Sequence, residues 1–436
     1  MDPLVLASLG LAAMFVLIAL HVPIGVAMGV SGFVCVGLML GWGPAISLLK
    51  TEPSGIVSNR ELAVIPLFLL MGAFAGAAGL SADLYRLAYA LVGHRRGGLA
   101  MSTIGGCAGF GAVCGSSVAT AATMTRVALP EMLNRGYQPA LATGCIAAGG
   151  TLGMLIPPSV IMVLYAVLTE QFVISLFIAA IIPGAIAVAL HFVAIFIYVR
   201  VYPEAGPAGP KMPWSERWTV CWQAWRVLIL GFVVSGGIYG GVFTVAEAAA
   251  IGAFMSFFFT WQSGRLTKAL LWNVLSEAAA NTGLIYLIII GASIFTYFVT
   301  LSHLPNHLVA AIQAFEVNPL VVIFLLLLMY LILGSIFDTV AAMVITLPFV
   351  FPLILDLGFD PIWFGVINVM VIEIGMITPP IGINVFVLHG IARDIPLKTI
   401  FRGIGPFLAA DLIRLAILVF FPVLALWLPR VMNMPM

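Results

Sequence analysis

Long apolar segments alternate with short polar connectors along almost the whole chain. Segments of this length cross the hydrocarbon core of a bilayer as helices, because about 20 helical residues span it. Polar or amphipathic connectors are expected at residues 41–62, 81–97, 200–225 and 263–281. The runs predicted to cross the membrane cover residues 4–20, 23–40, 63–80, 138–169, 172–199, 226–242, 244–262, 282–300, 363–392 and 405–428.

Two further apolar stretches, residues 98–133 and 319–355, are each interrupted near the middle. A long apolar stretch with a polar Gly-Ser turn at its centre is typical of a re-entrant helical hairpin, which enters and leaves the membrane on one side. The two interruptions are Cys114-Gly115-Ser116-Ser117 and Gly334-Ser335-Ile336-Phe337-Asp338.

Composition agrees with a chain whose solvent is lipid. It is 63% apolar and 8% charged, with a mean hydropathy of +1.18, whereas soluble domains carry about 25% charged residues. Apolar runs of this length predict an all-α polytopic membrane protein rather than a β-barrel. The net charge of +1 gives no case for nucleic acid as a partner. The five cysteines and six histidines show no metal-ligand spacing.

Basic residues fix the expected orientation. With ten crossings, two hairpins and an outside N-terminus, thirteen Lys and Arg residues fall in inside loops and three in outside loops. We expect a bacterial inner-membrane protein, and this bias places both of its termini on the periplasmic side. Arg95, Arg96 and Arg135 flank the first hairpin, which should therefore enter from the cytoplasm. No Lys or Arg occurs between Ala269 and Ala392, so the second hairpin should enter from outside.

The two halves of the chain repeat one pattern with opposite orientation. In each half a Gly-Ser interruption is followed by Leu-Pro and then by a Gly-Met-(Leu/Ile)-X-Pro-Pro sequence, in the same order and with similar spacing. The glycines Gly115 and Gly334 are 219 positions apart, and the pairs Pro157-Pro158 and Pro379-Pro380 are 222 apart. Such inverted repeats are typical of secondary transporters.

The proline pairs predict two broken helices. Proline removes a backbone donor and clashes with the preceding turn, so each pair leaves carbonyl oxygens without partners at membrane depth. Unsatisfied groups in lipid cost several kcal/mol each, so a bound cation or a water-lined cavity has to satisfy them. A simple kink, satisfied locally by Ser or Thr, is the alternative for one pair. Two pairs at matched places favour ion sites, and oxygen ligands of this kind suit Na⁺.

Three charged residues have two open interpretations each. Asp338 is an acid at a hairpin tip, which is by default a functional candidate in a membrane, but it could also cap the following helix. Glu373 serves either an ion pathway or hydrogen bonding within the bundle. Arg126 either binds a substrate carboxylate or extends to the cytoplasmic surface, and its distance from the tip favours the second.

Two further charged positions have structural interpretations. Arg414 is expected either to pack against a partner or to extend to the surface. Thr244 and Glu247 have the spacing of a capping box at a helix start.

At these motifs the chain resembles the large membrane subunit of TRAP transporters (tripartite ATP-independent periplasmic, the DctM-like family of the ion-transporter superfamily). The resemblance extends over residues 60–395, with departures at Cys114, where serine is common, and at Val245-Ala246, where Pro-Thr is usual. The residues that carry it are Gly115-Ser116-Ser117 with Ala119-Thr120, Pro130-Glu131-Met132, Arg135-Gly136-Tyr137, Ile156-Pro157-Pro158-Ser159, Phe243-Thr244 with Glu247-Ala248, Thr378-Pro379-Pro380 and Gly382-Ile383-Asn384.

The resemblance implies two Na⁺ sites and a substrate site, carried over by motif position. Substrate would lie between the hairpin tips, near Ser117, Ser159 and Asp338. The first Na⁺ would be held by carbonyl or hydroxyl groups of Cys114, Ser116, Gly153, Ile156 and Pro158. The second would be held by Gly334, Gly375, Thr378 and Ile381. Na⁺ is then the coupling ion, and no cofactor is expected.

The resemblance also implies an elevator-type fold, in which a transport domain slides past a scaffold. The expected division is 1–62 for N-terminal scaffold helices, 63–170 for the first repeat (hairpin 98–133, broken helix 138–169), 171–281 for scaffold helices and a connector, 282–392 for the second repeat (hairpin 319–355, broken helix 363–392) and 393–436 for a C-terminal scaffold helix. The implied partners are a small four-helix membrane subunit, a periplasmic substrate-binding protein, an organic-acid substrate such as a C4-dicarboxylate or sialic acid, and membrane lipid.

Energetics agree with ion coupling. Importing an anion against an inside-negative potential costs about 2.3 kcal/mol per charge per 100 mV, and the chain has no Walker A motif. A stand-alone Na⁺/carboxylate symporter, a passive channel and a membrane enzyme are the alternatives. The enzyme is disfavoured because Asp338 and Glu373 have no histidine near them in sequence.

Overall fold

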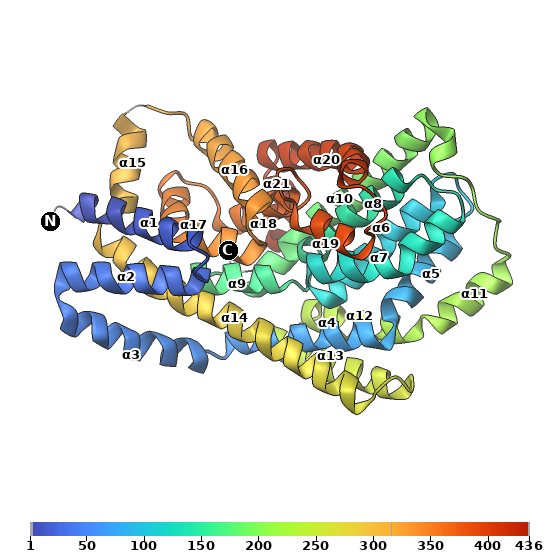
Figure 1. The fold of residues 1–436 in the computed structure, drawn as a ribbon, viewed down its shortest axis with the longest axis horizontal. Coiled ribbons are helices and arrows are strands. Elements are labelled where there is room, and N and C mark those ends of the chain that lie inside the picture. Colours follow the sequence, from blue (N-terminus) through green and yellow to red (C-terminus); the bar gives the residue numbers. More distant parts are fainter. Residues whose placement is uncertain (1–2, 315, 435–436) are drawn as a thin grey trace.

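The computed structural model describes residues 3–314 and 316–434, and every regular element in these ranges is a helix (Figure 1). Two are short 3₁₀ turns, η1 (Glu61–Ala63) and η2 (Pro203–Ala205). The α-helices of the N-terminal half are α1 (Pro3–Ala19), α2 (Ile24–Leu40), α3 (Trp42–Ser58), α4 (Val64–Ala78), α5 (Leu80–Val92), α6 (Gly98–Cys114), α7 (Ser117–Asn134), α8 (Pro139–Leu155), α9 (Val160–Thr169) and α10 (Val173–Val201).

Eleven α-helices follow in the described C-terminal half. They are α11 (Trp214–Gln223), α12 (Trp225–Tyr239), α13 (Val245–Gln262), α14 (Lys268–Leu301), α15 (Leu304–Ala314), α16 (Pro319–Ile336), α17 (Thr339–Asp356), α18 (Pro361–Gly375), α19 (Ile383–Ile391), α20 (Leu397–Phe420) and α21 (Val423–Val431). Six helices of the described chain are long and apolar enough to cross a membrane, and up to eight spans result if each bent pair counts as one. The predicted all-α polytopic class is confirmed.

One group of helices packs around α14. This helix lies against α2, α3 and α4, and α4 packs in turn along α13, which contacts α12. Figure 1 shows α14 running beside α2 and α3 across one side of the molecule. The contact between α2 and α14 is close because glycines meet there: a side chain on Gly291 would overlap the Gly25 carbonyl. Small residues allow this approach in membrane helices.

A second group contains both hairpins and both broken helices. Helix α8 packs against α6, α7 and α20, whereas α18 packs against α16, α17 and α20. Helix α10 contacts α20, α21 and α18. Residues of α10 and α20, which the sequence led us to expect in the scaffold segments 171–281 and 393–436, therefore pack with the repeats rather than around α14.

The structure corrects the register of the repeat at the hairpin tips. The helices that follow the tips, α7 and α17, begin at Ser117 and Thr339, which are 222 positions apart. They end at Asn134 and Asp356, also 222 apart, and α8 and α18 begin at Pro139 and Pro361 with the same spacing. The spacing of 219 expected from Gly115 and Gly334 was wrong, because those glycines do not occupy equivalent places.

Helix α14 also differs from the expected connector at 263–281. It starts at Lys268, where the Thr267 hydroxyl caps it by accepting from the Leu270 amide at 3.1 Å, and it continues without interruption to Leu301. The polar residues of its first turns line a cavity described below. They made this part of the helix look like a connector, and the boundary expected at 281/282 falls inside the helix.

The predicted capping box is confirmed at the start of α13. The Thr244 hydroxyl accepts from the Glu247 amide at 3.3 Å, and the Glu247 carboxylate accepts from the Thr244 amide at 2.8 Å. Both groups would otherwise be unpaired donors at a helix N-terminus.

Candidate functional site

The first hairpin turns within two residues. Helix α6 ends at Cys114, Gly115 takes a left-handed conformation with φ +63°, and Ser116 caps α7 by accepting from the Ala119 amide at 3.3 Å. Glycine is suited to this conformation because a side chain would be strained there. Cys114 is buried, and its backbone packs on Gly72 of α4.

The first broken helix lies directly against this tip. A side chain on Gly111 of α6 would overlap the Gly153 backbone of α8. A Cβ on Gly153 would lie 3.0 Å from the Ser116 carbonyl oxygen and 2.8 Å from Thr120 Oγ1. The Thr120 hydroxyl is buried and, apart from the neighbouring Cys114 thiol, has no hydrogen-bonding partner in the described chain. Thr120 was not predicted as a site residue from the sequence, although it belongs to the family motif that runs from Gly115 to Thr120.

The break itself runs from Ile156 to Ser159. Ile156 ends α8 in an extended conformation, the Pro157–Pro158 bond is cis, and Ser159 precedes α9. A Cβ on Gly115 would lie 3.4 Å from the Pro158 carbonyl oxygen, which places this oxygen beside the hairpin tip. The Ser159 hydroxyl is fully buried and unpaired among the described residues. Tip and break of the first repeat therefore meet, as predicted.

The second repeat has the same arrangement. Asp338 caps α17 by accepting from the Ala341 amide at 3.0 Å, so this acid does cap the helix that follows it. Gly375 at the end of α18 faces Gly334, because a Cβ on Gly375 would lie 2.7 Å from the Gly334 Cα. The Gly382 amide donates to the Ser335 carbonyl at 3.1 Å and connects the break to its hairpin.

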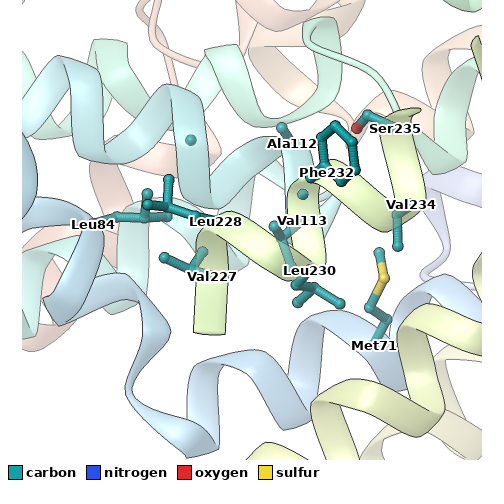
Figure 2. Close-up of a pocket in the computed structure, with 12 residues that line it drawn as sticks. Met71, Leu84, Ala112, Val113, Val227, Leu228, Leu230, Phe232, Val234 and Ser235 are labelled. Carbon is teal, nitrogen blue, oxygen red and sulfur yellow. The ribbon is translucent and has the colours of Figure 1, made fainter. Parts of the chain in front are cut away.

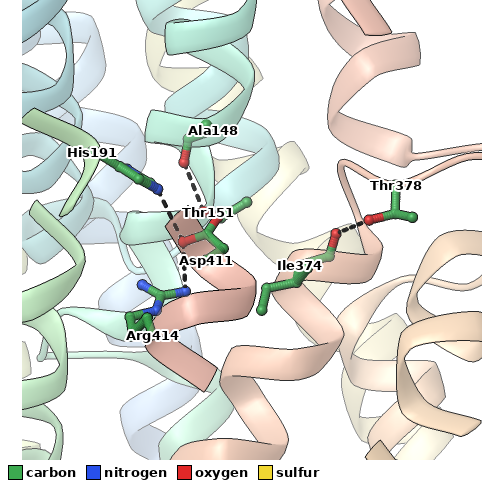
Figure 3. Close-up of polar contacts among 7 residues, drawn as sticks. All are labelled: Ala148, Thr151, His191, Ile374, Thr378, Asp411 and Arg414. Carbon is green, nitrogen blue, oxygen red and sulfur yellow. Dashed lines mark hydrogen bonds and ion pairs between the residues drawn. The ribbon is translucent and has the colours of Figure 1, made fainter. Parts of the chain in front are cut away.

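The second break is longer than the first. Residues 376–382 separate α18 from α19, and the Pro379–Pro380 bond within them is cis. The Thr378 hydroxyl donates to the Ile374 carbonyl at 2.7 Å (Figure 3), and Gly382 has a positive φ of +66°. Ile381 is 38% exposed, so this part of the break is the least enclosed of the predicted Na⁺ positions.

Glu373 joins the two hairpin tips. The Thr339 hydroxyl lies 2.7 Å from Glu373 Oε1, and the Ser117 hydroxyl lies 3.5 Å from the same atom. Both hydroxyls also contact the Met376 sulfur, at 2.9 Å and 3.5 Å. Ser117 and Thr339 are the first residues of α7 and α17. The Ser117 side chain, which we predicted to meet substrate, is fully buried and points to this carboxylate instead.

A second bridging residue is Asn384, near the start of α19. Its side chain is fully buried, both of its polar atoms are unpaired among the described residues, and its Nδ2 would lie 3.4 Å from a Cβ on Gly150 of α8. Helix α19 of the second repeat packs on α7 of the first, and α9 of the first packs on α17 of the second. The pseudo-symmetric crossing therefore brings both breaks and both tips to one place.

A cavity of about 640 Å³ leads to the first tip. Cys114 and Ser116 lie at one part of its wall, and Arg126 on α7 and Arg265 before α14 lie at others. Helix α14 contributes further polar residues, Asn273, Glu277 and Asn281. Arg126 is exposed to this space. The cavity lies between α14 and the first hairpin.

A different, almost wholly apolar pocket of about 330 Å³ lies between α12 and the first hairpin (Figure 2). Met71, Val113 and Phe232 are among its lining residues, and the Ser235 hydroxyl is its one labelled polar group. It has no charged side chain and does not reach either hairpin tip.

Sequence comparison decides the family. The family model described as "Tripartite ATP-independent periplasmic transporter, DctM component" matches residues 11–424. The chain belongs to this family. The permease is 36% identical to the C4-dicarboxylate TRAP transporter large permease protein DctM of Pseudomonas aeruginosa, over 91% of this chain and 94% of that relative. It is 31% identical to the sialic acid TRAP transporter large permease protein SiaM of Vibrio cholerae, over 90% and 92% of the two chains.

The fold of the permease is similar to that of a solved transporter structure. The Alcanivorax borkumensis YdaH transporter, whose topology is described as unusual, matches with a TM-score of 0.61 and 18% identity, over 88% of this chain and 89% of that one. At this identity the likeness concerns the fold alone.

Removing the Thr339 hydroxyl from the permease should loosen the junction of the two repeats. In Thr339→Val, the Glu373 carboxylate would lose its 2.7 Å donor inside the protein, which costs about 1–3 kcal/mol for a buried group. We expect a lower apparent melting temperature of the purified protein. Thr339→Ser keeps the hydroxyl and is the control, and equal melting of the two variants would show that the hydrogen bond contributes nothing.

Proposed function

We propose that the permease imports a small organic acid by Na⁺-coupled symport, together with a periplasmic substrate-binding protein. One observation carries the proposal: two broken helices each meet their own hairpin tip, and the two tips meet each other at Glu373. This arrangement collects unpaired oxygens from four helix ends in a buried place. Such a place suits a dehydrated cation beside an anionic substrate.

The first Na⁺ site would use oxygens around the first tip. The Ser116 carbonyl and the Thr120 hydroxyl face the bare Gly153 backbone, where a side chain would fill the space. The Pro158 carbonyl lies close to Gly115. We add the Thr120 hydroxyl to the predicted ligands from Cys114, Ser116, Gly153, Ile156 and Pro158, because it is buried without an oxygen or nitrogen partner in the described chain.

The second Na⁺ site would use the wider break of the second repeat. The Thr378 hydroxyl donates a hydrogen bond to the Ile374 carbonyl and keeps its lone pairs free to bind a cation. Carbonyl groups of Gly334, Gly375 and Ile381 would complete the site. Among the described residues, no group of three or more His, Cys, Asp or Glu side chains is placed to hold a metal. In this proposal backbone and hydroxyl oxygens hold the ions.

Substrate would bind between the tips, near Ser159 and Asp338. The buried Ser159 hydroxyl is free to donate, and the N-terminus of α9 that follows it is the positive end of a helix dipole. Ser117 has a different role in this proposal, because its hydroxyl faces Glu373. It would position the tip rather than touch substrate.

Movement would follow the division into two packing groups. The helices around α14 would form the scaffold, and the hairpins and broken helices would form the sliding transport domain, together with α10 and α20, which pack on them. Helix α20, which falls in the expected scaffold segment 393–436, would in this proposal move with the transport domain. The cavity beside Arg126 and Arg265 would open to the cytoplasm, in agreement with the distribution of basic residues, and the described conformation would face inward.

The partners would be a small four-helix subunit in the inner membrane and a secreted binding protein. The isethionate TRAP transporter permease protein DctMQ of Oleidesulfovibrio alaskensis supports a partner of this size, because the permease matches 58% of its longer chain at 30% identity. A stand-alone Na⁺/carboxylate symporter of the same superfamily is the second candidate, because the solved YdaH transporter shares the fold.

Reconstituted uptake tests the proposal. Proteoliposomes with the permease and its small subunit should accumulate the labelled acid only with an inward Na⁺ gradient and the loaded binding protein. Uptake that persists when K⁺ replaces Na⁺ would refute Na⁺ coupling. Uptake by the permease alone, without a binding protein, would favour the stand-alone symporter.

Ser116 offers a test of the first ion site. Ser116→Leu should weaken Na⁺ affinity about tenfold or more, because a bulky side chain at the tip would displace the carbonyl that faces Gly153. Ser116→Ala should be mild, since it removes only the 3.3 Å cap to Ala119. The measurement is the Na⁺ dependence of the melting temperature, and unchanged affinity in the Leu variant would argue against the site.

A further inference from the structure

The cavity between α14 and the first hairpin continues well beyond the hairpin tip. Its volume of about 640 Å³ is within the range of small-molecule sites, about 300–1,000 Å³. It follows one face of α7, because the lining residues of that helix recur at intervals of three and four positions. From the tip onward these residues are Ser116, Ala119, Ala122, Thr123, Arg126 and Val127.

Two arginines lie at the end of this cavity that is away from the tip. Arg126 follows Ser116 by ten positions, which corresponds to about 15 Å along a helix. Arg265 Nη1 lies 3.5 Å from the Ala77 carbonyl of α4, and Gly72, five positions earlier on α4, packs on the tip. Helices α4 and α7 both run from the tip toward α5, which they contact, so the two arginines share one end of the cavity.

This end of the cavity is positively charged. Arg126 is exposed to the cavity and forms no ion pair or hydrogen bond with any residue of the described chain. Arg265 faces Asp83 electrostatically, but the same carboxylate also faces Arg86 and Arg226. One acid therefore stands against three arginines there, and Arg126 adds a fourth positive charge without any acid of its own.

The end of the cavity near the tip carries the acid instead. Glu277 on α14 is the one carboxylate among the described residues that line the cavity, and it is close enough to Cys114 to act electrostatically on the thiol. Asn273 and Asn281, one turn before and one turn after Glu277, add only neutral amides. An anion that leaves the tip is thus repelled at the start of the cavity and attracted at its end.

We propose that Arg126, assisted by Arg265, forms a second anion site, which binds a carboxylate of the transported acid after it leaves the hairpin tips and before it reaches the cytoplasm. This inference rests on the proposed import of an organic acid. Arginine binds carboxylates through paired N–H donors. A four-carbon acid spans about 5 Å at most between its carboxyl carbons, so it cannot reach the tips and Arg126 at once.

An arginine that only anchors the hairpin at the membrane surface would behave differently. It would bind the phosphate of an anionic lipid headgroup and would have no effect on a soluble carboxylate. Both ligands present an anion to the same guanidinium group, so lipid composition has to be varied in the test.

The experiment measures binding of succinate, a C4-dicarboxylate, to the full-length permease with its small subunit in phosphatidylcholine nanodiscs. Choline chloride replaces Na⁺, so that the proposed Na⁺-dependent site at the tips is not loaded, and saturation-transfer NMR detects weak binding. We expect saturable binding of succinate and none of succinamide, its uncharged diamide. Succinate should still bind when phosphatidylglycerol is added to the nanodiscs.

Variants of Arg126 test the site directly. Arg126→Gln should weaken succinate binding about tenfold or more, because a charge-assisted paired contact is lost. Arg126→Lys keeps the charge without the paired donors and should have an intermediate affinity. Arg135→Gln is the control and should bind as the unaltered permease does. Arg135 is an exposed arginine directly after α7 that pairs with Glu131 at 2.7 Å and does not line the cavity.

Uptake by the same proteins tests whether the site lies on the transport path. In proteoliposomes with the binding protein, Arg126→Gln should lower the maximal uptake rate about threefold or more, because the anion would leave the cavity without a counter-charge. The Na⁺ concentration for half-maximal uptake should stay within about twofold, since Arg126 is far from the proposed ion sites.

The outcomes separate this inference from the proposed function. Succinate that fails to bind without Na⁺, or that binds Arg126→Gln as tightly as the unaltered permease, would overturn the inference, while Na⁺-driven uptake would still support the proposed function. Loss of succinate binding with phosphatidylglycerol would assign Arg126 to lipid and overturn it too, as would an unchanged uptake rate in Arg126→Gln. Absence of Na⁺-driven uptake by the unaltered permease would overturn the proposed function, and the release role with it.

Discussion

Replacing Asp338 with asparagine should abolish uptake, lowering the initial rate about 100-fold or more, while the protein remains folded in the membrane. Asp338 lies at the second hairpin tip, in the proposed substrate site, and an ionisable group inside a membrane protein is retained at a cost in stability. Asparagine keeps the cap to the Ala341 amide, which is 3.0 Å from the carboxylate. The uptake of Asp338→Asn therefore reports the effect of losing the charge and not of losing the cap.

Asp360 provides the matched control for this experiment. It caps α18 by accepting from the Ile362 and Trp363 amides at 2.9 Å and 3.1 Å, but it lies at the opposite end of that helix from the break. Asp360→Asn should leave uptake within about twofold of normal. Equal loss of uptake in both variants would show that the effect is not specific to the second hairpin tip, and normal uptake by Asp338→Asn would exclude Asp338 from the site.

The second large effect concerns the scaffold. Gly291→Ala should lower the apparent melting temperature by more than about 5 °C, because the added methyl group would overlap the Gly25 carbonyl and push α2 away from α14. The neighbouring Gly32 and Phe295 backbones, which are also in close contact, would be separated by the same movement. Thermal unfolding of the purified permease, followed by intrinsic fluorescence, measures this effect.

Gly283 lies on the same helix and serves as the reference. A methyl group there meets no atom within 4 Å. Gly283→Ala should leave the melting temperature unchanged or raise it slightly, since alanine is favoured over glycine inside a helix by about 1 kcal/mol. Similar destabilisation by both substitutions would mean that the approach of α2 and α14 does not control stability.

Most of the architecture followed from local patterns in the sequence. Apolar length predicted the helices, the proline pairs predicted the breaks, and Thr244 with Glu247 predicted the capping box. These features depend on residues close together in the chain, so a single sequence carries them. The contact of each break with its own hairpin was also predicted, because in each half a hairpin and a proline pair follow one another in the same repeat.

The matching of Gly334 with Gly115 was wrong for a local reason. Gly334-Ser335 resembles Gly115-Ser116, but Ser335 turns its hydroxyl back to the Ile332 carbonyl at 2.7 Å and stays inside α16. Asp338, three residues later, is an equally good or better cap and ends the turn. Competition between two capping residues, and not the glycine, sets the start of α17.

Other site residues depend on contacts that no local pattern contains. Ser117 and Glu373 are 256 positions apart in the chain, and Asn384 meets the first repeat only through the crossing of α19 over α7. Arg414 packs against a buried partner, as one of its two expected interpretations had it: it contacts Asp411 on its own helix, and Asp411 in turn contacts His191 on α10. Such pairings are set by how the two repeats interlock, which hydropathy and motif spacing do not specify.

The constant spacing of 222 residues between matching helices has a practical consequence for experiments. From the end of α6 to the proline pair after α8, and from the end of α16 to the proline pair after α18, a position in one half has a counterpart 222 residues later in the other. Side chains can therefore be transplanted between halves one at a time. Ser116 matches Asp338 and Thr151 matches Glu373, so at both positions only the second half carries an acid. Exchanging the residues of each pair would test whether transport requires the acid in that half.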